Sequence, residues 1–408
     1  MRILTVLTYY APHISGLTVY ARRVVRRLVA NGHEVTVLTS RFSHDLPLRE
    51  VVDGATVIRS PVLVRVSKGA LMPLFPWQAA RLIASHDLVY LHLPQFEASC
   101  AALLAKAMRK PLVTSYQCDI ELPPGLARLI FTPAIRLSHY VTGKLSDRIV
   151  VTSADFGETA RLPQRFKHKV SSVYPPIEIA EGGQSDCTLR DRYNLGDGPL
   201  VGFVGRLAEE KGIDYLIGSV PRVLREVPDA RYVLAGPTDT VPGERVHERV
   251  RPKLEAMGSK VVHIGVLTDV ELQEFYRAVN VLVLPSINST ESFGMTQAEA
   301  MLVGTPVVTT NMPGVREAVR VTGMGELVPP RDEEALAAGI VAVLRNPLRY
   351  ARPEHEIREL FDPAKTATFY EELFLQLLRD RRGVSSDEPE PLAQAPRDGV
   401  GPERGQRP

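Results

Sequence analysis

The sequence predicts an α/β protein with two domains, each a doubly wound parallel β-sheet covered by helices. Its 408 residues are too many for one ordinary hydrophobic core and fit two domains of about 150 to 200 residues each. Short apolar runs rich in β-branched residues alternate with segments of helical apolar spacing, a pattern typical of parallel sheets. Residues 174–198, with two prolines and a glycine pair, interrupt this alternation, which resumes at Leu200.

The first half opens with a βαβ unit. Strands are predicted at residues 3–7 and 34–38, and the helix between them, 18–30, ends at the capping pair Asn31-Gly32. Three further strands are predicted at residues 88–91, 112–114 and 148–152. The helices between them are predicted at 98–108 and 126–145. Because the carboxyl ends of parallel strands meet at one edge of the sheet, we expect Gly16, His92 and Asp119 to lie together there.

The second half repeats the alternation. Strands are predicted at residues 200–204, 232–235, 261–264, 281–284 and 306–309, and a last helix at 366–379. Ligands of open α/β sheets bind outside the carboxyl ends of the strands. The loops after the first and fourth of these strands, 205–212 and 286–294, are therefore the candidate ligand-binding loops.

The loop 286–294 and the helix after it have the features of an anion site. Gly294 lets the backbone approach a ligand closely, and the first N–H groups of the helix, from Met295 to Gln297, are free to bind phosphate. Glu291 and Glu299 flank this cradle and would repel phosphate. We expect both carboxylates to accept hydrogen bonds from sugar hydroxyls instead.

Three segments together resemble the GT4 family of retaining glycosyltransferases, which have the GT-B fold and use nucleotide-diphosphate sugars. The first is Glu291, seven residues and Glu299, with Phe-Gly inside. The second is the loop 205–212, Gly-Arg followed by Glu-Lys-Gly. The third is the loop 9–16, in which Ser15 replaces the first of two glycines usual in the family. The resemblance covers residues 1–379 and implies two Rossmann-like domains that face each other across a cleft.

The resemblance also implies roles for individual residues. Catalytic roles at the reacting sugar and the donor diphosphate fall to Glu291, Lys211, Arg206 and His92. Donor-binding roles, which include the ribose for Glu299 and the base for the loop at Val266, fall to Gly16, Phe293, Gly294, Met295, Thr296, Glu299 and Val266. Gln117, where the family often has His, and Asp119 lie on the acceptor side.

The resemblance gives the domain plan as well. We expect an acceptor-side domain at 1–175, a linker at 176–198 and a nucleotide-sugar domain at 199–362. A helix at 363–382 would cross back onto the first domain. Residues 383–408 are rich in Pro, Gly, Ser, Glu and Arg, and we expect them to be disordered.

Metal ions and cofactors are not expected. The sequence contains no Asp-X-Asp pair that would hold a divalent metal on the phosphates. Arg206 and Lys211 supply positive charge for the diphosphate instead.

The charge is unevenly distributed, which predicts an anionic partner. The net charge is +2, but residues 1–175 contain 22 Lys and Arg against 11 Asp and Glu. Arg22, Arg23, Arg26 and Arg27 fall on one side of the helix 18–30, and residues 71–77 and 126–140 are apolar. Such a combination suits an anionic membrane surface.

Localisation follows from targeting signals and cysteines. No stretch reaches the roughly 18 apolar residues of a membrane span, the N-terminal strand is too short for a signal peptide, and the three cysteines match no disulfide spacing. We expect a cytoplasmic protein that lies peripherally on the inner face of the membrane.

The sequence thus predicts a metal-independent retaining glycosyltransferase. It would move a hexose-type sugar from a nucleotide-diphosphate donor to a lipid-linked or glycan acceptor. One alternative is a sugar-nucleotide epimerase of the same fold, which releases a changed donor without an acceptor. Another is a non-catalytic protein that binds nucleotide sugars or nucleic acid, although the basic residues lack the interleaved aromatics of a nucleic-acid surface.

Overall fold

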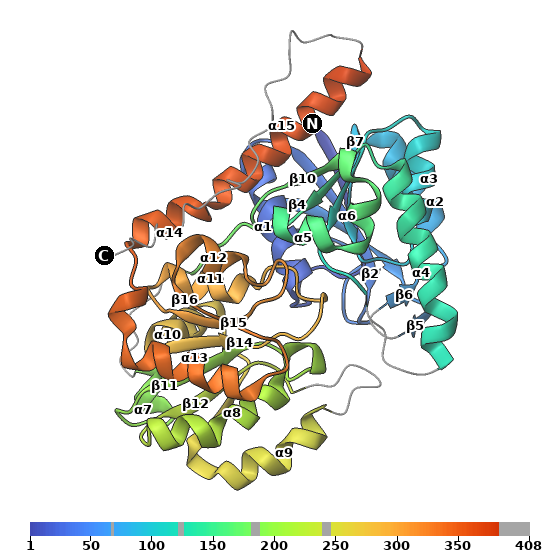
Figure 1. Ribbon diagram of the computed structural model, residues 1–408. Helices are drawn as coiled ribbons and strands as arrows, with labels where there is room; N and C mark the ends of the chain where they lie inside the picture. The colour runs from blue at the N-terminus through green and yellow to red at the C-terminus, as the bar shows by residue number, and fades with distance from the viewer. Residues whose placement is uncertain (67–68, 121–125, 181–187, 239–245, 383–408) are drawn as a thin grey trace.

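The computed structural model describes residues 1–66, 69–120, 126–180, 188–238 and 246–382, which form two doubly wound sheets with helices on both faces (Figure 1). The predicted fold class is confirmed. The first sheet has the order β10-β9-β8-β7-β1-β2-β4-β3 and the second the order β13-β12-β11-β14-β15-β16. All described strand pairs of the two sheets are parallel except β3 with β4. The predicted disordered tail, 383–408, lies outside the described residues.

The first sheet and its helices occupy the N-terminal half. Its strands are β1 (Arg2–Val6), β2 (Glu34–Arg41), β3 (Arg49–Val52), β4 (Ala55–Pro61), β7 (Leu88–Leu93), β8 (Leu112–Tyr116), β9 (Arg148–Val151) and β10 (Val170–Ser172). Its helices are α1 (Gly16–Ala30), α2 (Phe75–Ser85), α3 (Ala98–Ala107), α4 (Leu126–Leu145), α5 (Ala154–Thr159), α6 (Arg161–Arg165) and the 3-10 turn η1 (Lys167–Lys169). A small hairpin, β5 (Val64–Val66) and β6 (Gly69–Leu71), precedes α2.

The second sheet follows the same plan. Its strands are β11 (Leu200–Val204), β12 (Arg231–Ala235), β13 (Val261–Gly265), β14 (Val281–Leu284), β15 (Val307–Thr310) and β16 (Gly325–Val328). Its helices are α7 (Leu189–Arg192), α8 (Ile213–Glu226), α9 (Val246–Met257), α10 (Asp269–Ala278), α11 (Met295–Leu302), α12 (Glu317–Thr322), α13 (Glu333–Arg345) and α14 (Glu354–Leu360). Three 3-10 turns are η2 (Glu209–Lys211), η3 (Gly258–Lys260) and η4 (Pro347–Tyr350).

The strand orders place a switch point in each sheet. β1 pairs with β2 on one side and β7 on the other, and β11 pairs with β12 and β14 in the same way. The loops that leave the carboxyl ends of such strands diverge to opposite faces, which opens room for a ligand. In the second sheet these are the loops after β11 and β14, which contain Arg206, Lys211, Glu291 and Gly294.

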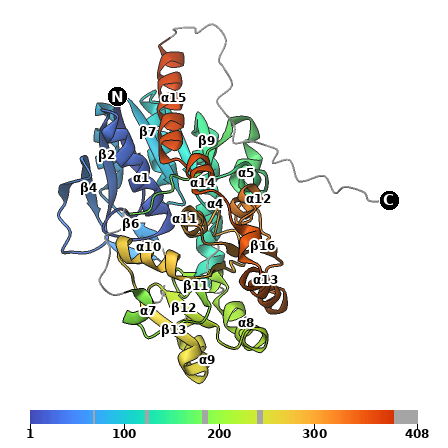
Figure 2. The ribbon, with the colours of Figure 1, turned by 90° about the vertical axis from the view of Figure 1, so that its left-hand side faces the viewer.

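The last helix, α15 (Pro363–Arg381), packs on the first sheet although it follows the second. Figures 1 and 2 both show it beside α1. Tyr370, Leu373 and Phe374 are fully buried in the core that contains α1, and the Tyr370 hydroxyl lies 2.7 Å from that of Tyr20. This helix therefore ties the two halves of the chain together.

Several elements differ from the predicted ones. β3 to β6, α2, α13 and β16 were not predicted. The strands among them are short, whereas α13 has buried apolar residues at helical spacing, such as Leu336, Ile340 and Val343, which the prediction missed. Within the predicted linker lies the helix α7, and its first residue, Leu189, packs with Leu195 into the core of the second sheet. No helix in the described part of the chain is long and apolar enough to cross a membrane.

Candidate active site

The loop after β11 is shaped by two glycines with positive φ. Gly205 has φ 149° and Gly212 has φ 67°. A Cβ atom at Gly212 would lie only 1.9 Å from the carbonyl oxygen of Pro285, at the end of β14. Only glycine allows this close approach, which places η2 and its last residue, Lys211, against the loop that follows β14.

Lys211 and Glu291 form an ion pair, although they are 80 positions apart in the chain. The Lys211 ammonium contacts Oε2 of Glu291, and Oε1 of Glu291 accepts a hydrogen bond of 3.0 Å from the backbone N–H of Gly294. Both side chains are about four-fifths buried, with 21% and 17% of their surface exposed. The structure thus brings together two of the predicted catalytic residues and the start of the predicted phosphate cradle.

The cradle itself begins at Gly294, which has φ 76° and ψ 70° and directly precedes α11. A Cβ atom at Gly294 would lie 2.3 Å from the side chain of Leu284, so this turn also requires glycine. Met295 and Thr296 occupy the first two positions of α11, where backbone N–H groups have no partner within the helix. These groups and the helix dipole can bind an anion.

Arg206 lies at the mouth of the same loop. Its guanidinium donates to Glu210 at 2.6 Å, and one third of its side chain is exposed. Burial, and then the charges of Arg206 and Arg65, lower the pKa of His13. The charge of Arg206 is therefore felt in the loop between β1 and α1, and a Cβ on Gly16, the first residue of α1, would lie 4.0 Å from Met295 Cε.

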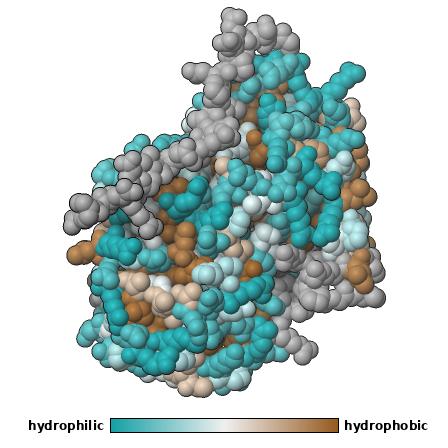
Figure 3. Space-filling model, in the orientation of Figure 1, coloured by the Kyte–Doolittle hydropathy of each residue, from teal (hydrophilic) through white to brown (hydrophobic). Residues whose placement is uncertain are grey.

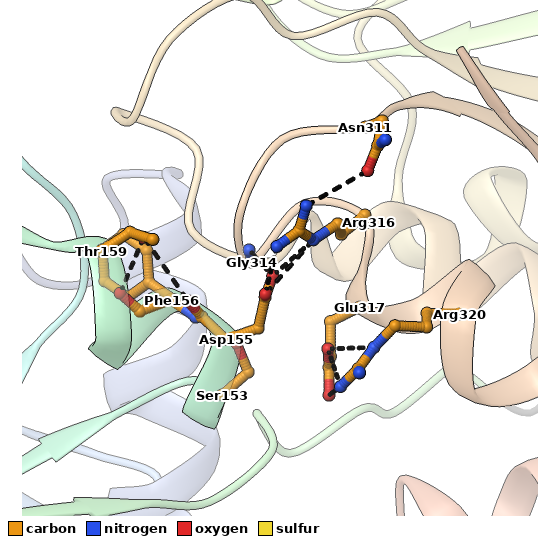
Figure 4. Close-up of polar contacts among 9 residues, drawn as sticks. All are labelled: Ser153, Asp155, Phe156, Thr159, Asn311, Gly314, Arg316, Glu317 and Arg320. Atoms are coloured by element: carbon orange, nitrogen blue, oxygen red, sulfur yellow. Dashed lines mark hydrogen bonds and ion pairs between the residues drawn. The ribbon is translucent and has the colours of Figure 1, made fainter. Parts of the chain in front are cut away.

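Other contacts anchor the second domain on the first. The Asp119 N–H donates to the carbonyl of Ser289 at 3.2 Å, and the Thr152 hydroxyl donates to that of Ser292 at 3.1 Å. In Figure 4, Asp155 of α5 accepts hydrogen bonds from the Gly314 N–H, at 2.6 Å, and from the Arg316 guanidinium. The loop that contains Glu291 is therefore held from the side of the first domain.

The prediction that His92 contacts a substrate is not supported. His92 lies inside β7 with 0% of its surface exposed, and its ring packs 4.3 Å from that of Tyr90. Burial lowers its pKa to about 3, and neither ring nitrogen has a hydrogen-bond partner in the described structure. The strand continues for one residue past His92 and its face is covered, which a pattern of apolar runs does not reveal.

Two predicted donor residues have different surroundings from those expected. The Phe293 ring is 1% exposed and packs against Tyr174 and Phe361, at 5.7 and 5.8 Å, so only its backbone borders the cradle. Glu299 accepts hydrogen bonds of 2.8 Å from both Arg23 and Tyr276. Its carboxylate holds α1 against α11, and each oxygen keeps a lone pair for the predicted ribose hydroxyl.

The predicted arginine stripe on α1 is also corrected. Arg23 pairs with Glu299, Arg22 with Asp53, and both Arg26 and Arg27 with Glu178. Each of the four arginines therefore has an acidic partner, and the three carboxylates neutralise most of the charge of the stripe. The sequence could not show this, because the partners lie 31 or more positions away along the chain.

The predicted acceptor-side residues and the predicted base-binding loop directly follow the carboxyl ends of two strands, β8 and β13. The Gln117 amide, just past β8, donates to the Ser115 hydroxyl at 2.5 Å, and Asp119 accepts from the Tyr116 hydroxyl. Val266, after β13, is exposed. Sequence reasoning missed His13, Arg23, Asp155 and Arg316, of which only His13 has a local signal, its position in the loop after β1.

Metal ligands do not cluster in the residues described here. No group of three or more His, Cys, Asp and Glu side chains among them could hold a metal ion. The groups available to an anionic ligand are the cations Lys211 and Arg206 and the start of α11.

Comparison with known proteins matches both halves of the chain. Residues 14–181 match the family described as Glycosyltransferase Family 4, and residues 198–346 match the family described as Glycosyl transferases group 1. The chain is 25% identical over 348 residues to phosphatidyl-myo-inositol mannosyltransferase of Mycolicibacterium smegmatis, and the aligned region covers 85% of each protein. It is 28% identical over 375 residues to D-inositol 3-phosphate glycosyltransferase of Acidothermus cellulolyticus, which covers 82% of this chain and 79% of the relative.

Solved structures share the fold. HepE of Anabaena in complex with UDP has a TM-score of 0.72 at 19% identity, over 92% of this chain and 100% of that one. Sucrose-phosphate synthase of Thermosynechococcus elongatus has a TM-score of 0.70 at 21% identity, over 93% of this chain and 99% of that one.

Proposed function

The chain belongs to the GT4 glycosyltransferases of GT-B fold, and we propose that it transfers a hexose-type sugar from a nucleotide-diphosphate donor to an acceptor on its first domain. The observation that carries this proposal is the Lys211–Glu291 pair beside the start of α11. It combines a cation and free N–H groups, which suit a diphosphate, with a carboxylate, which suits sugar hydroxyls. The relative HepE has been solved with UDP and with UDP-glucose.

The proposed chemistry follows from these positions. Cleavage of the bond between sugar and diphosphate leaves negative charge on the diphosphate, and Lys211, Arg206 and the N–H groups of α11 are fixed to stabilise it. Glu291 is held by Lys211 and Gly294 as a hydrogen-bond acceptor. We expect attack from the face of the leaving group and therefore retention of the anomeric configuration.

We expect the reaction to need no metal ion. The support is the basic clamp together with the absence of an Asp-X-Asp pair from the sequence. Activity should survive excess EDTA. Loss of activity that magnesium or manganese restores would contradict this part of the proposal.

The acceptor is proposed to be lipid-linked or a glycan, delivered at the inner face of the membrane in the cytoplasm. The helices α2, α3 and α4 contain basic residues but no Asp or Glu. Trp77 of α2 is 64% exposed and Leu129 of α4 is 73% exposed, and Figure 3 shows apolar side chains along this edge of the molecule. Apolar and basic groups without acidic ones suit a surface of anionic lipid.

Co-sedimentation with vesicles tests the membrane proposal. Binding should occur with anionic but not zwitterionic vesicles, weaken with salt, and fall when Trp77 and Leu129 become Gln. Arg26→Gln/Arg27→Gln is the matched control, because those arginines pair with Glu178. Full recovery in the supernatant with both vesicle types at low salt would contradict the proposal.

A donor screen tests the enzymatic function. UDP-, GDP- and ADP-sugars are incubated with the protein, with and without a membrane extract as acceptor source, and the anomeric configuration of the product is determined by NMR. Transfer that depends on the extract, with retention, is expected. Release of an epimerised sugar nucleotide without an acceptor would identify an epimerase instead, and binding of nucleotide sugars without turnover would indicate a non-catalytic protein.

A further inference from the structure

The loop between β1 and α1 contains His13, which was not among the predicted site residues. The His13 backbone N–H donates to the Tyr10 carbonyl at 3.1 Å, and its ring stacks on that of Tyr9 with 4.6 Å between the centroids. The Phe42 ring, 5.6 Å away, packs edge-on against the imidazole. The imidazole therefore has a defined position, and it is only partly buried.

A buried arginine anchors this loop to the first sheet. Arg59 of β4 is 0% exposed, and its guanidinium donates to the carbonyl of Ala11 at 2.7 Å and to that of Pro47 at 3.3 Å. The same guanidinium forms an ion pair with Glu50 of β3. Because Ala11 lies two residues before His13, the backbone that carries the imidazole is fixed by a buried contact.

Hydrogen bonds decide which nitrogen of the neutral imidazole carries the proton. The Thr18 hydroxyl donates to the Tyr9 carbonyl at 3.3 Å, and its oxygen lies 3.4 Å from Nδ1 of His13. Because the hydroxyl has one proton and a carbonyl can only accept, Nδ1 carries a proton and donates to the Thr18 oxygen. The lone pair is then on Nε2, which has no hydrogen-bond partner among the described residues. Nε2 is therefore available to a ligand.

His13 lies beside the proposed diphosphate site. Three residues farther along the chain, a Cβ atom on Gly16 would lie 4.0 Å from Cε of Met295, the first residue of α11. The charge of Arg206, which belongs to the other domain, acts on the His13 imidazole. The loop therefore borders the same space as the start of α11 and Arg206, two of the groups proposed to bind the diphosphate.

The charges that act on the imidazole are both positive. Burial lowers the pKa of His13, and Arg206 and then Arg65 of β5 lower it further. Glu210 is paired with Arg206, and Glu97 acts on the stacked tyrosine, whose own pKa burial raises. A diphosphate beside Arg206 reverses this balance, because its negative charges favour the protonated imidazole.

We infer that His13 is a further residue of the nucleotide-sugar site, and that its Nε2 takes up one proton from the solution when the diphosphate binds and donates it in a hydrogen bond to a phosphate oxygen. The inference rests on the proposed function, since it adds a residue to the same site. The N–H bond is the only covalent bond that forms, and the proton returns to the solution when the nucleoside diphosphate leaves. The same hydrogen bond stabilises the charge that develops on the leaving diphosphate.

Calorimetry of nucleotide-sugar binding tests the inference, with UDP-glucose, GDP-mannose and ADP-glucose as probes. Their diphosphates do not titrate between pH 6 and pH 8, so a pH dependence of Kd reports on the protein. In the wild type the Kd of a probe that binds should fall about three- to tenfold from pH 8 to pH 6, because the bound state holds more protons than the free state. At pH 7 the binding enthalpy should differ between PIPES and Tris buffers, as proton uptake requires.

His13→Gln and His13→Phe should both abolish the proton uptake. His13→Phe keeps an aromatic ring to stack on Tyr9, so it separates the loss of the proton from the loss of packing. Both variants should weaken binding at pH 6 and leave it within about twofold of the wild type at pH 8, where the wild-type imidazole is proposed to bind fewer protons. His355→Gln, which changes an exposed histidine on α14, is the matched control and should keep the proton uptake.

The inference and the proposed function can fail separately. Equal proton uptake in the wild type and in His13→Gln would overturn the inference and assign the proton to another group, such as Glu97. Binding without proton uptake in the wild type, or equal weakening of the His13 variants at both pH values, would overturn it as well and leave the proposed function intact. A wild type that binds none of the three nucleotide sugars would overturn the proposed function, and the inference with it.

Discussion

Lys211 and Glu291 neutralise each other in a setting where about a fifth of each side chain is exposed. Removal of either partner leaves the other charge partly buried and alone, which disturbs the loop as well as the chemistry. The pair also marks the point at which the diphosphate and the transferred sugar are proposed to meet. Substitutions that keep the volume but remove the charge therefore give the most direct information about this site.

Lys211→Met and Glu291→Gln should each lower kcat by at least about tenfold, because each removes a charged contact at the reacting centre. Steady-state kinetics with the donor found by the screen provides the measurement. Lys253→Met is the control, since Lys253 lies 3.8 Å from Asp214 on an exposed surface. Full activity in folded Lys211 and Glu291 variants would show that the site has been assigned wrongly.

Glu97, which directly precedes α3, predicts a pH dependence of stability. Burial raises the pKa of its carboxyl group to about 7 from an ordinary value of 4.5. Between these two values the folded state holds the proton and the unfolded state does not, so this contribution to stability is complete below pH 4.5 and is lost as the pH rises to 7. The loss should be about 1 to 2 kcal/mol after allowance for the exposed part of the side chain.

Glu97→Gln removes this titration. Calorimetry measures Tm at pH 5 and at pH 8. Between these two pH values the Tm of the wild type should fall relative to the Tm of Glu97→Gln. An identical change in Tm for both proteins would mean that the Glu97 carboxyl group is not protonated in the folded state at pH 5 to 7.

At the scale of elements, α1 and α11 are held together by one buried carboxylate. Glu299 is 5% exposed and joins Arg23 of α1 to Tyr276 of α10, so three helices from both domains meet at it. The sequence pattern predicted a ribose ligand at this position. In the structure each carboxylate oxygen accepts one hydrogen bond, so we expect a stabilising role for Glu299, and the ribose contact stays a prediction.

Glu299→Ala should lower the free energy of unfolding by about 2 to 4 kcal/mol, because it leaves the Arg23 charge and the Tyr276 hydroxyl without a partner. Urea unfolding followed by circular dichroism measures this. Glu255→Ala, which breaks the exposed pair with Arg251, should cost less than about 0.5 kcal/mol. Unchanged stability of Glu299→Ala together with a raised donor KM would instead support the ribose role.

At the scale of the whole molecule, the two domains make polar contacts around the candidate site. Asp155 at the first turn of α5 accepts from Gly314 and from Arg316, which precedes α12 (Figure 4). Asp155 is largely buried, since 12% of its side chain is exposed. This contact, at α5, and the Glu299–Arg23 pair, between α11 and α1, join the domains at different places, so together they limit rotation of one domain relative to the other.

Asp155→Asn should loosen this arrangement, because it removes the charge from the bidentate contact with Arg316. We expect a larger radius of gyration by small-angle X-ray scattering and a several-fold lower kcat/KM. Asp191→Asn, an exposed change in α7, serves as the control. An unchanged radius of gyration in Asp155→Asn would show that other contacts hold the domains together.

The sequence by itself determined the alternation of strands and helices and the loops that carry the chemistry. β11, β14 and α4 have the predicted bounds, because continuous apolar runs and apolar stripes of helical period reflect burial within one element. The glycines at 205, 212 and 294 could also be recognised in the sequence. Each adopts a positive φ, which is a property of the local backbone that glycine permits.

Only the tertiary structure decided which charges meet. Arg22, Arg23, Arg26 and Arg27 form a basic stripe in the sequence, but in the folded chain each of them has an acidic partner. His92 was expected at an edge and lies in a core, and Arg136 with Arg161 and Arg165 gathers around one cavity from two helices. Coulomb energy and burial depend on distance in space, and a sequence fixes that distance only for residues within one helix or strand.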